Sequence, residues 1–172
     1  MDVKPSRLVV DTNVLIDIAD EVDEVLTAID IISLRLPAAE QLVTPVVLDE
    51  LAFLADFGQT ASLRASAGTV FDLLRNKSRF RPILELPFAS EQAELLAREF
   101  RHRKLLPAGE IHDSLILAES ILLDCNILLT SDEHLRSIDH QQLIGLLNQH
   151  DLTAPVIAPL EQLFVNSSGS DI

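Results

Sequence analysis

The chain has 172 residues, 48% of them hydrophobic, which predicts one globular domain with a buried core and excludes an intrinsically disordered protein. No stretch reaches the roughly 18–20 apolar residues of a membrane span, and the N-terminus lacks a basic and then apolar secretory signal. The single cysteine, Cys125, excludes an internal disulfide and is expected to fill space in the core, so we expect a cytoplasmic protein with no membrane partner.

The formal net charge of −14 argues against nucleic-acid binding, because affinity for a phosphate backbone comes from Lys and Arg. The charge is unevenly distributed, however. Between Arg64 and Lys104, nine Lys and Arg residues accompany five Asp and Glu, whereas the rest of the chain has four basic and 22 acidic residues. The basic segment is either a solvated face of two or three helices or a surface that follows a substrate.

The first half of the chain predicts alternating strands and helices. The predicted elements are a buried strand at 7–10, a helix at about 13–33, a strand at 41–43 and helices at 45–57 and 61–74. Thr44 and Pro45 form a typical helix start, with a hydroxyl residue at the cap and proline in the first turn, and Gly58 is a typical helix end.

The second half continues the pattern after a basic loop at 75–81. It predicts a short extended segment at 83–86, helices at 90–104, 111–123 and 133–148, a strand at 127–130 and an edge strand at 155–158. Strands that alternate with helices imply parallel crossovers, and hence a three-layer α/β/α sandwich around a mostly parallel sheet. We expect residues 1–165 to form this domain and residues 166–172 to be a flexible tail.

Four carboxylates stand where strands give way to helices or on helices that flank the same sheet edge. They are Asp11, Glu50, Asp113 and Asp132. In open α/β sheets ligands bind beyond the carboxyl ends of the strands, and carboxylates gathered there repel one another unless a divalent cation neutralises them. The pattern therefore predicts a magnesium or manganese site, which typically acts on phosphate esters.

Each carboxylate also has a simpler explanation. Asp11 and Asp132 could be ordinary helix caps, and Asp113 with Glu110 could complement the dipole of a helix start. Glu50 is harder to explain, because its helical neighbours at three and four residues are all apolar: Val46, Val47, Phe53 and Leu54. Asp49 points elsewhere on that helix and is expected to be the solvated member of the pair.

Four short motifs together resemble the PIN domain, a metal-dependent ribonuclease fold. The motifs are Val9-Val10-Asp11-Thr12-Asn13, Glu50-Leu51, Asp113-Ser114-Leu115-Ile116-Leu117-Ala118 and Leu129-Thr130-Ser131-Asp132. The resemblance covers essentially the whole chain. It extends to VapC-type toxins, although the stretch from Arg64 to Lys104 is longer than in compact toxins and favours the larger PIN domains of RNA decay and processing.

The resemblance implies an endoribonuclease that uses Mg²⁺ or Mn²⁺ to hydrolyse single-stranded RNA, as a toxin of a toxin–antitoxin pair or in another setting. It assigns metal ligation and catalysis to Asp11, Glu50, Asp113 and Asp132, and the orientation of these carboxylates to Asn13 and Thr130. It also implies an RNA substrate, an antitoxin or other protein partner, and a homodimer as one form of assembly.

The basic segment supplies the candidate substrate-binding residues, which we expect to line the approach to the metal. They are Arg75, Lys77, Arg79, Arg81, Arg101, Arg103 and Lys104. Two alternatives stay open at this point. One is a catalytically silent PIN-fold module that binds RNA or protein, which the full set of four carboxylates disfavours. The other is a phosphatase with an aspartyl nucleophile, which Asn13 disfavours because that chemistry usually has a second Asp at this place.

Overall fold

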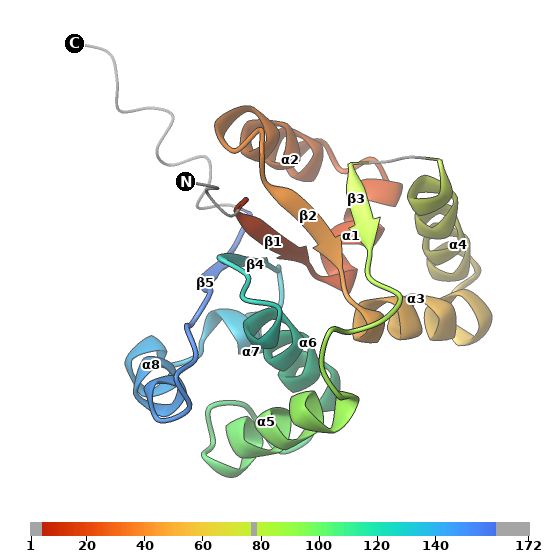
Figure 1. Cartoon of the computed structure of the whole chain (residues 1–172). Helices are drawn as coiled ribbons and strands as arrows, with labels where there is room; N and C mark the ends of the chain where they lie inside the picture. The colour runs from red at the N-terminus through yellow and green to blue at the C-terminus, as the bar shows by residue number, and fades with distance from the viewer. Residues whose placement is uncertain (1–4, 77–78, 161–172) are drawn as a thin grey trace.

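The computed structural model describes residues 5–76 and 79–160 of the chain. Its centre is a sheet of five parallel strands in the order β3-β2-β1-β4-β5 (Figure 1). The strands are β1 (Arg7–Val10), β2 (Glu40–Val43), β3 (Phe80–Pro82), β4 (Ile127–Leu129) and β5 (Val156–Ala158). β1 lies in the middle, and the predicted edge strand near residue 155 is present as β5.

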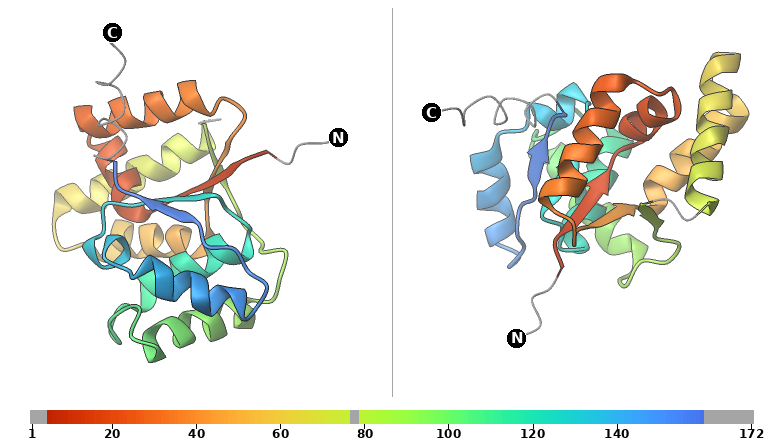
Figure 2. Two further views of the ribbon diagram at one scale, coloured as in Figure 1. Left: turned by 90° about the vertical axis from the view of Figure 1, so that its left-hand side faces the viewer. Right: turned by 90° about the horizontal axis from the view of Figure 1, so that it is seen from above.

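The helices lie on both faces of the sheet, which confirms the three-layer α/β/α architecture (Figures 1 and 2). One side carries α1 (Thr12–Ala19), α2 (Asp23–Arg35) and α4 (Ala61–Arg75). The other carries α5 (Ser90–His102), α6 (Ile111–Leu122), α7 (Glu133–Arg136) and α8 (His140–Asn148). The remaining helix, α3 (Pro45–Phe57), follows β2 and packs against both α4 and α6. In the described part of the chain, no helix has the length and apolar character needed to cross a membrane.

The predicted start and end of α3 are confirmed, with Thr44 at the cap, Pro45 in the first turn and Gly58 after the last residue. The long predicted helix at 13–33 is wrong, because the structure has α1 and α2 in its place. Glu21 adopts a left-handed conformation with φ 57°, and the Val22 amide bonds to the Asp17 carbonyl. A left-handed residue of this kind ends a helix and is usually glycine. Because position 21 is a glutamate, the sequence did not indicate a helix end there.

Two further boundaries differ from the sequence-based expectation. The predicted helix at 133–148 is divided into α7 and α8, because Asp139 accepts hydrogen bonds from the amides of Gln141 and Gln142 and starts a new helix. The third strand lies at Phe80–Pro82, where it overlaps the end of the predicted basic loop at 75–81 and precedes the predicted extended segment at 83–86. The predicted tail at 166–172 lies outside the described residues.

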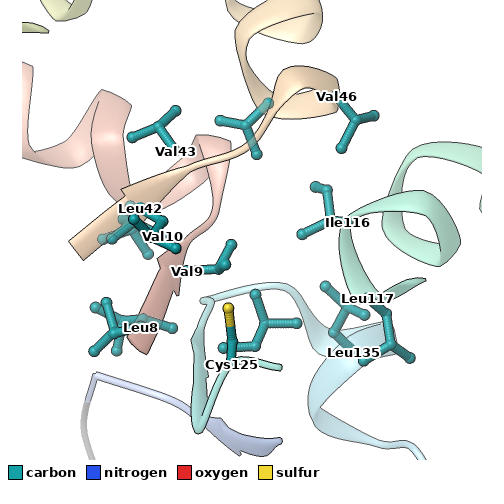
Figure 3. Packing of buried hydrophobic residues seen from close by; sticks show 14 of the residues in the cluster. Leu8, Val9, Val10, Leu42, Val43, Val46, Ile116, Leu117, Cys125 and Leu135 are labelled. Atoms are coloured by element: carbon teal, nitrogen blue, oxygen red, sulfur yellow. The ribbon is translucent and has the colours of Figure 1, made fainter. Parts of the chain in front are cut away.

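The core lies between the sheet and the helices on either side. Val9, Val10 and Leu128 are fully buried in the sheet, and Leu117 of α6 belongs to the same buried cluster. Figure 3 shows part of this cluster. Cys125 is buried in the same cluster, as expected of a small core residue. Because these apolar side chains fix the strands, the polar residues just beyond the strand ends are held on a rigid support.

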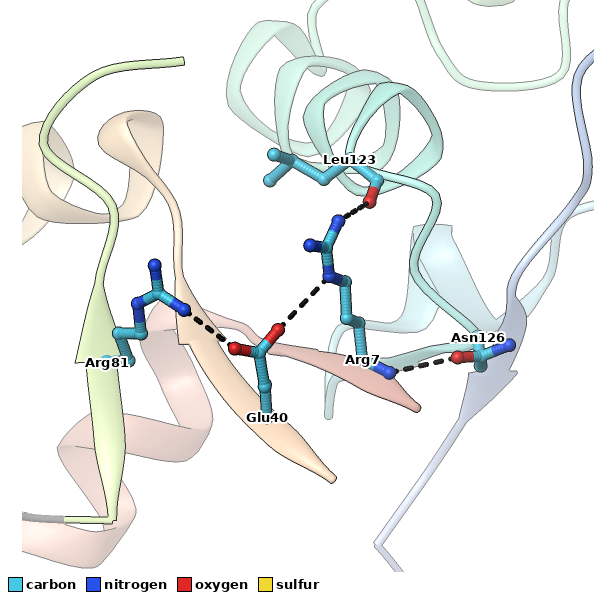
Figure 4. A network of polar contacts seen from close by, with 5 residues as sticks. All are labelled: Arg7, Glu40, Arg81, Leu123 and Asn126. Carbon is cyan, nitrogen blue, oxygen red and sulfur yellow. Dashed lines mark hydrogen bonds and ion pairs between the residues drawn. The ribbon is translucent and has the colours of Figure 1, made fainter. Parts of the chain in front are cut away.

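Polar contacts join three strands near the amino ends of β1 and β2, opposite the edge where Asp11 lies. Glu40 accepts from Arg7 at 3.1 Å and from Arg81 at 2.7 Å, while Arg7 also donates to the Leu123 carbonyl at 2.9 Å (Figure 4). Asn126 accepts from the Arg7 amide at 2.9 Å. This network ties β3, β2 and β1 to the end of α6.

Candidate metal centre

Asp11 lies at the carboxyl end of the central strand and is 3% exposed. Its Oδ1 accepts the Thr12 amide at 2.6 Å, and its Oδ2 accepts the Thr130 hydroxyl at 2.5 Å. The pKa of Asp11 is raised to about 6, chiefly by burial; the two hydrogen bonds oppose the rise, and the charges of Glu50 and Asp132 contribute to it. Asp11 is thus the cap of α1 and also one member of a group of carboxylates.

Glu50 reaches toward Asp11 from α3. It is half-buried, and its Oε2 accepts the Thr12 hydroxyl at 2.5 Å. The expectation that Glu50 sits inside an apolar stripe is only partly met, since Val46 and Val47 are buried but Phe53 is 60% exposed. Asp49 is exposed, as predicted. Glu50 therefore lies at the border between the core and solvent, where its carboxylate can reach a bound ion.

Asp113 lies in the first turn of α6, which packs against α3 and α7. The pKa of Asp113 is raised to about 8, chiefly by burial and then by the negative charges of Asp132 and Asp11. Glu110, three residues earlier, acts in the same direction through its charge and a hydrogen bond. The Oδ2 atom of Asp113 is buried and has no hydrogen-bond partner among the described residues.

Asp132 follows β4 and caps the short helix α7. Its Oδ1 accepts hydrogen bonds from the amides of His134 and Leu135 at 2.8 and 3.1 Å. Asp132 is therefore a helix cap, as the simpler explanation predicted. The Asp132 amide donates to the Thr130 hydroxyl at 2.9 Å. Since the same hydroxyl donates to Asp11, Thr130 links the two carboxylates that follow β1 and β4.

The four sequence-predicted carboxylates lie near enough to influence one another. Asp11 responds to the charges of Glu50 and Asp132, and Asp113 responds to those of Asp11 and Asp132. Within residues 5–76 and 79–160, however, no three His, Cys, Asp or Glu side chains are already arranged as ligands of one metal ion. Hydrogen bonds to Thr12, Thr130 and the α7 amides hold three of the four carboxylates.

The residues around the carboxylates differ in part from those predicted. Thr130 is fully buried and bonds to Asp11, which fits its predicted orienting role. Asn13 is exposed, and within the described chain it forms no hydrogen bond to any of the four carboxylates. Thr12, one residue earlier, makes the contact to Glu50 instead. Sequence reasoning missed Thr12, although its place directly after Asp11 was a usable signal.

Much of the predicted basic surface lies away from the carboxylates. Arg81 pairs with Glu40 at the amino end of β2 (Figure 4). Arg79 pairs with Asp30 of α2 at 3.0 Å. These two placements do not support the prediction that Arg79 and Arg81 line the approach to the metal. Arg75 is exposed beside Asp72 at 3.9 Å, and Lys77 lies outside the described residues.

The basic residues at the end of α5 lie closer to the site. Arg101 donates to the hydroxyl of Ser114, the residue that follows Asp113. Arg103 is exposed and pairs with Glu99 of its own helix at 3.2 Å, and Lys104 is exposed in the turn after the helix. Among the predicted substrate-binding residues that the structure describes, Arg101 is therefore the one tied directly to the helix of a candidate ligand.

A cavity of about 580 Å³ lies between α3, α4 and the segment after β3. Its lining is mainly apolar and includes Leu48, Phe71 and Ile83, and none of the four candidate ligands contributes to it. The size of this cavity does not identify it as the reactive site, because catalysis on a phosphate ester requires charged groups. The carboxylates stay the better candidate centre.

A comparison with protein-family models finds the PIN domain over residues 8–141, a range that includes all four carboxylates. The chain belongs to the PIN domain family. PIN domains are generally nucleases that use divalent metal ions. The resemblance inferred from the four motifs is therefore confirmed at the level of the family.

Solved structures with the same fold include two VapBC toxin–antitoxin complexes. VapBC2 from Rickettsia felis, bound to a DNA fragment from its promoter, matches with a TM-score of 0.61 and 14% identity, covering 89% of this chain and 98% of the other. VapBC-1 from nontypeable Haemophilus influenzae matches with a TM-score of 0.56 and 15% identity, covering 90% and 98%. At these identities the likeness shows the fold. A search of curated proteins gave no match.

Proposed function

We propose that this PIN domain is an endoribonuclease that cleaves single-stranded RNA with Mg²⁺ or Mn²⁺ held by Asp11, Glu50, Asp113 and Asp132. The observation that carries the proposal is the Oδ2 atom of Asp113, which is buried without a hydrogen-bond partner among the described residues. A buried carboxylate oxygen in this state is costly unless it binds a proton or a cation. The raised pKa of Asp113 corresponds to a bound proton. A divalent cation would satisfy the same oxygen in place of the proton.

The donor set fits a hard divalent cation, because carboxylate oxygens are its preferred ligands. When bound, the ion would polarise a phosphodiester and lower the pKa of a water molecule for attack on phosphorus. The chain's own contribution is to hold the ligands. Thr130 fixes one oxygen of Asp11 and the backbone at Asp132, and Thr12 fixes one oxygen of Glu50. Such supporting contacts set both the metal affinity and the orientation of the ligands.

RNA would approach from the end of α5 rather than from β3. Arg101 is held beside α6 by Ser114, and Arg103 and Lys104 follow it on the exposed turn. Contacts of this type position a phosphate backbone without reading its sequence. Arg79 and Arg81 are left out of the proposed path, since both are engaged in ion pairs elsewhere.

A toxin of a toxin–antitoxin pair is the specific setting that the structural comparisons favour, because two solved structures with this fold are VapBC complexes. The net charge of −14 suits a basic antitoxin, since opposite charges steer association. Expression of the chain should then slow growth of a bacterial host, and Asp113→Asn should relieve that effect. The antitoxin and the homodimer both stay predictions.

Cleavage of a generic single-stranded RNA, with Mn²⁺ or with chelator, tests the proposed activity. Wild type should cleave only with metal, and Glu50→Gln and Asp113→Asn should each lose at least 100-fold in rate. Asp49→Asn is the matched control, because it removes an exposed carboxylate next to Glu50 and should keep the wild-type rate. Wild type that binds RNA and Mn²⁺ without cleaving would establish the silent module instead.

A further inference from the structure

Glu119 is a second buried carboxylate on α6, outside the candidate metal centre. It is 5% exposed, and its Oε2 accepts the backbone amide of Val46 at 3.2 Å. Burial raises the pKa of Glu119, and the charge of Asp49 adds to that rise, whereas the Thr44 hydroxyl and the Val46 amide beside the carboxylate oppose it. Burial of a carboxylate is costly unless a hydrogen-bonding or charged partner compensates it.

The partner of Glu119 is the first turn of α3. This helix has no side-chain hydrogen bond from its own cap residue, Thr44, and Pro45 has no amide hydrogen to offer. Val46 therefore carries the first free amide of α3, and Glu119 supplies from another helix the acceptor that a cap normally provides. The negative charge also lies at the positive end of the helix dipole.

The same contact joins the two helices that carry two of the candidate ligands. Val46 precedes Glu50 by four residues on α3, which is about 6 Å along the helix axis and on nearly the same face. Glu119 follows Asp113 by six residues on α6, about 9 Å along its axis. Because α3 and α6 pack together, this hydrogen bond fixes how far one helix slides or rotates against the other.

We propose that Glu119 is a positioning residue that holds the start of α3 against α6 and so keeps Glu50 opposite Asp113 in the metal centre. The inference rests on the proposed function, since it concerns the geometry of that same site. Glu119 touches neither metal nor RNA in this account. Its effect passes through the Val46 amide and the rigid first turns of α3.

Three variants separate positioning from general stability. Glu119→Ala removes the acceptor, whereas Glu119→Gln keeps an oxygen that can accept the Val46 amide. Ser120→Ala is the matched control, because Ser120 is also fully buried on α6 but donates only to the Ile116 carbonyl of its own helix. Calorimetry of Mn²⁺ binding to each full-length protein gives the affinity, and hydrogen exchange reports the Val46 amide directly.

We expect Glu119→Ala to weaken Mn²⁺ binding about tenfold, in the range seen when partners of metal ligands are removed, and to speed exchange at Val46. Glu119→Gln and Ser120→Ala should stay within twofold of wild type in Mn²⁺ affinity. If wild type binds Mn²⁺ through Asp113 and Glu119→Ala binds it with the same affinity, the positioning role is overturned and the metal centre is not. Wild type that binds no Mn²⁺ would overturn the metal centre, and this inference would fall with it.

Discussion

Single residues at this site combine a structural role with a proposed chemical one. Asp11 and Asp132 both cap helices, yet both also raise the pKa of Asp113 by their charge. A cap uses only one carboxylate oxygen here, since the Thr12 amide contacts Oδ1 of Asp11 and the α7 amides contact Oδ1 of Asp132. The capping and ligand explanations are therefore compatible, because a hydrogen-bonded carboxylate can still share its oxygens with a cation.

The pKa of Asp113 predicts how the metal-free protein responds to pH. Its folded value of about 8 lies above the ordinary value of 3.8, so the folded state holds more protons than the unfolded state between these values. The stabilising contribution is complete below about pH 4 and is lost as pH rises to about 8. Asp113→Asn should remove this dependence, so denaturation in chelator should show its advantage over wild type widening from pH 5 to pH 8.

We expect that advantage to reach on the order of 1 kcal/mol at pH 8, because partial exposure of Asp113 screens the repulsion. Saturating Mn²⁺ should reverse the order, with wild type the more stable protein. Unfolding free energies that run parallel across this pH range would show that Asp113 carries no unfavourable charge in the folded state.

At the scale of elements, the helix ends decide where the functional side chains lie. Left-handed residues follow α1, α5, α6 and α8, and none of them is glycine: Glu21, Lys104, Asp124 and Asp151. α5 ends at His102, two residues before the predicted boundary, and Arg101 near its end donates to Ser114 in the first turns of α6. The short loop from the end of α5 to Glu110 then brings Asp113 to the sheet edge. These turns are energetically tolerable because the flanking helices pack on the sheet.

The two basic elements predict different effects on RNA binding. Arg101→Gln, at the end of α5, should weaken binding of all RNA sequences and reduce the salt dependence of the affinity by about one unit in the log–log slope. Arg81→Gln, on β3, should leave both unchanged, because Arg81 pairs with Glu40 at the other edge. Fluorescence anisotropy at several salt concentrations measures both quantities, and Mn²⁺ affinity within twofold of wild type confirms an intact site. Loss of binding in Arg81→Gln alone would move the RNA path to β3.

For the whole molecule, the excess of negative charge is the dominant electrostatic feature. A net charge of −14 on 172 residues disfavours the compact state through self-repulsion and disfavours contact with RNA. A divalent cation at the sheet edge would relieve part of this repulsion at the point where the carboxylates gather. Metal binding should therefore contribute to folding as well as to catalysis.

The thermal midpoint should accordingly rise with Mn²⁺ in wild type. At a free concentration about 100 times the Kd, binding adds about 2.7 kcal/mol, or roughly 5–10 °C for a domain of this size. Asp113→Asn should lose most of this increase, while Asp49→Asn should keep it. Differential scanning calorimetry in matched ionic strength makes the comparison, and an equal increase in all three proteins would indicate general screening rather than a specific site.

The α/β architecture, most of the strands and helices, and the places of the four carboxylates along the chain follow from the sequence alone. These features are local: apolar runs define the strands, and Thr44, Pro45 and Gly58 define α3 within the chain segment that forms it. The positions of Asp11 and Asp132 just after buried strands follow from the same local pattern, because a parallel sheet brings the ends of its strands to one edge.

Which side chains support that edge depends on contacts between segments that are distant in the chain. The bond from Thr130 to Asp11 joins residues 119 apart, and that from Val46 to Glu119 joins residues 73 apart. That Arg81 faces Glu40 likewise depends on β3 pairing with β2. No local pattern encodes such contacts, because strand order and helix packing result from the burial of the whole core, in which each segment's position depends on all the others.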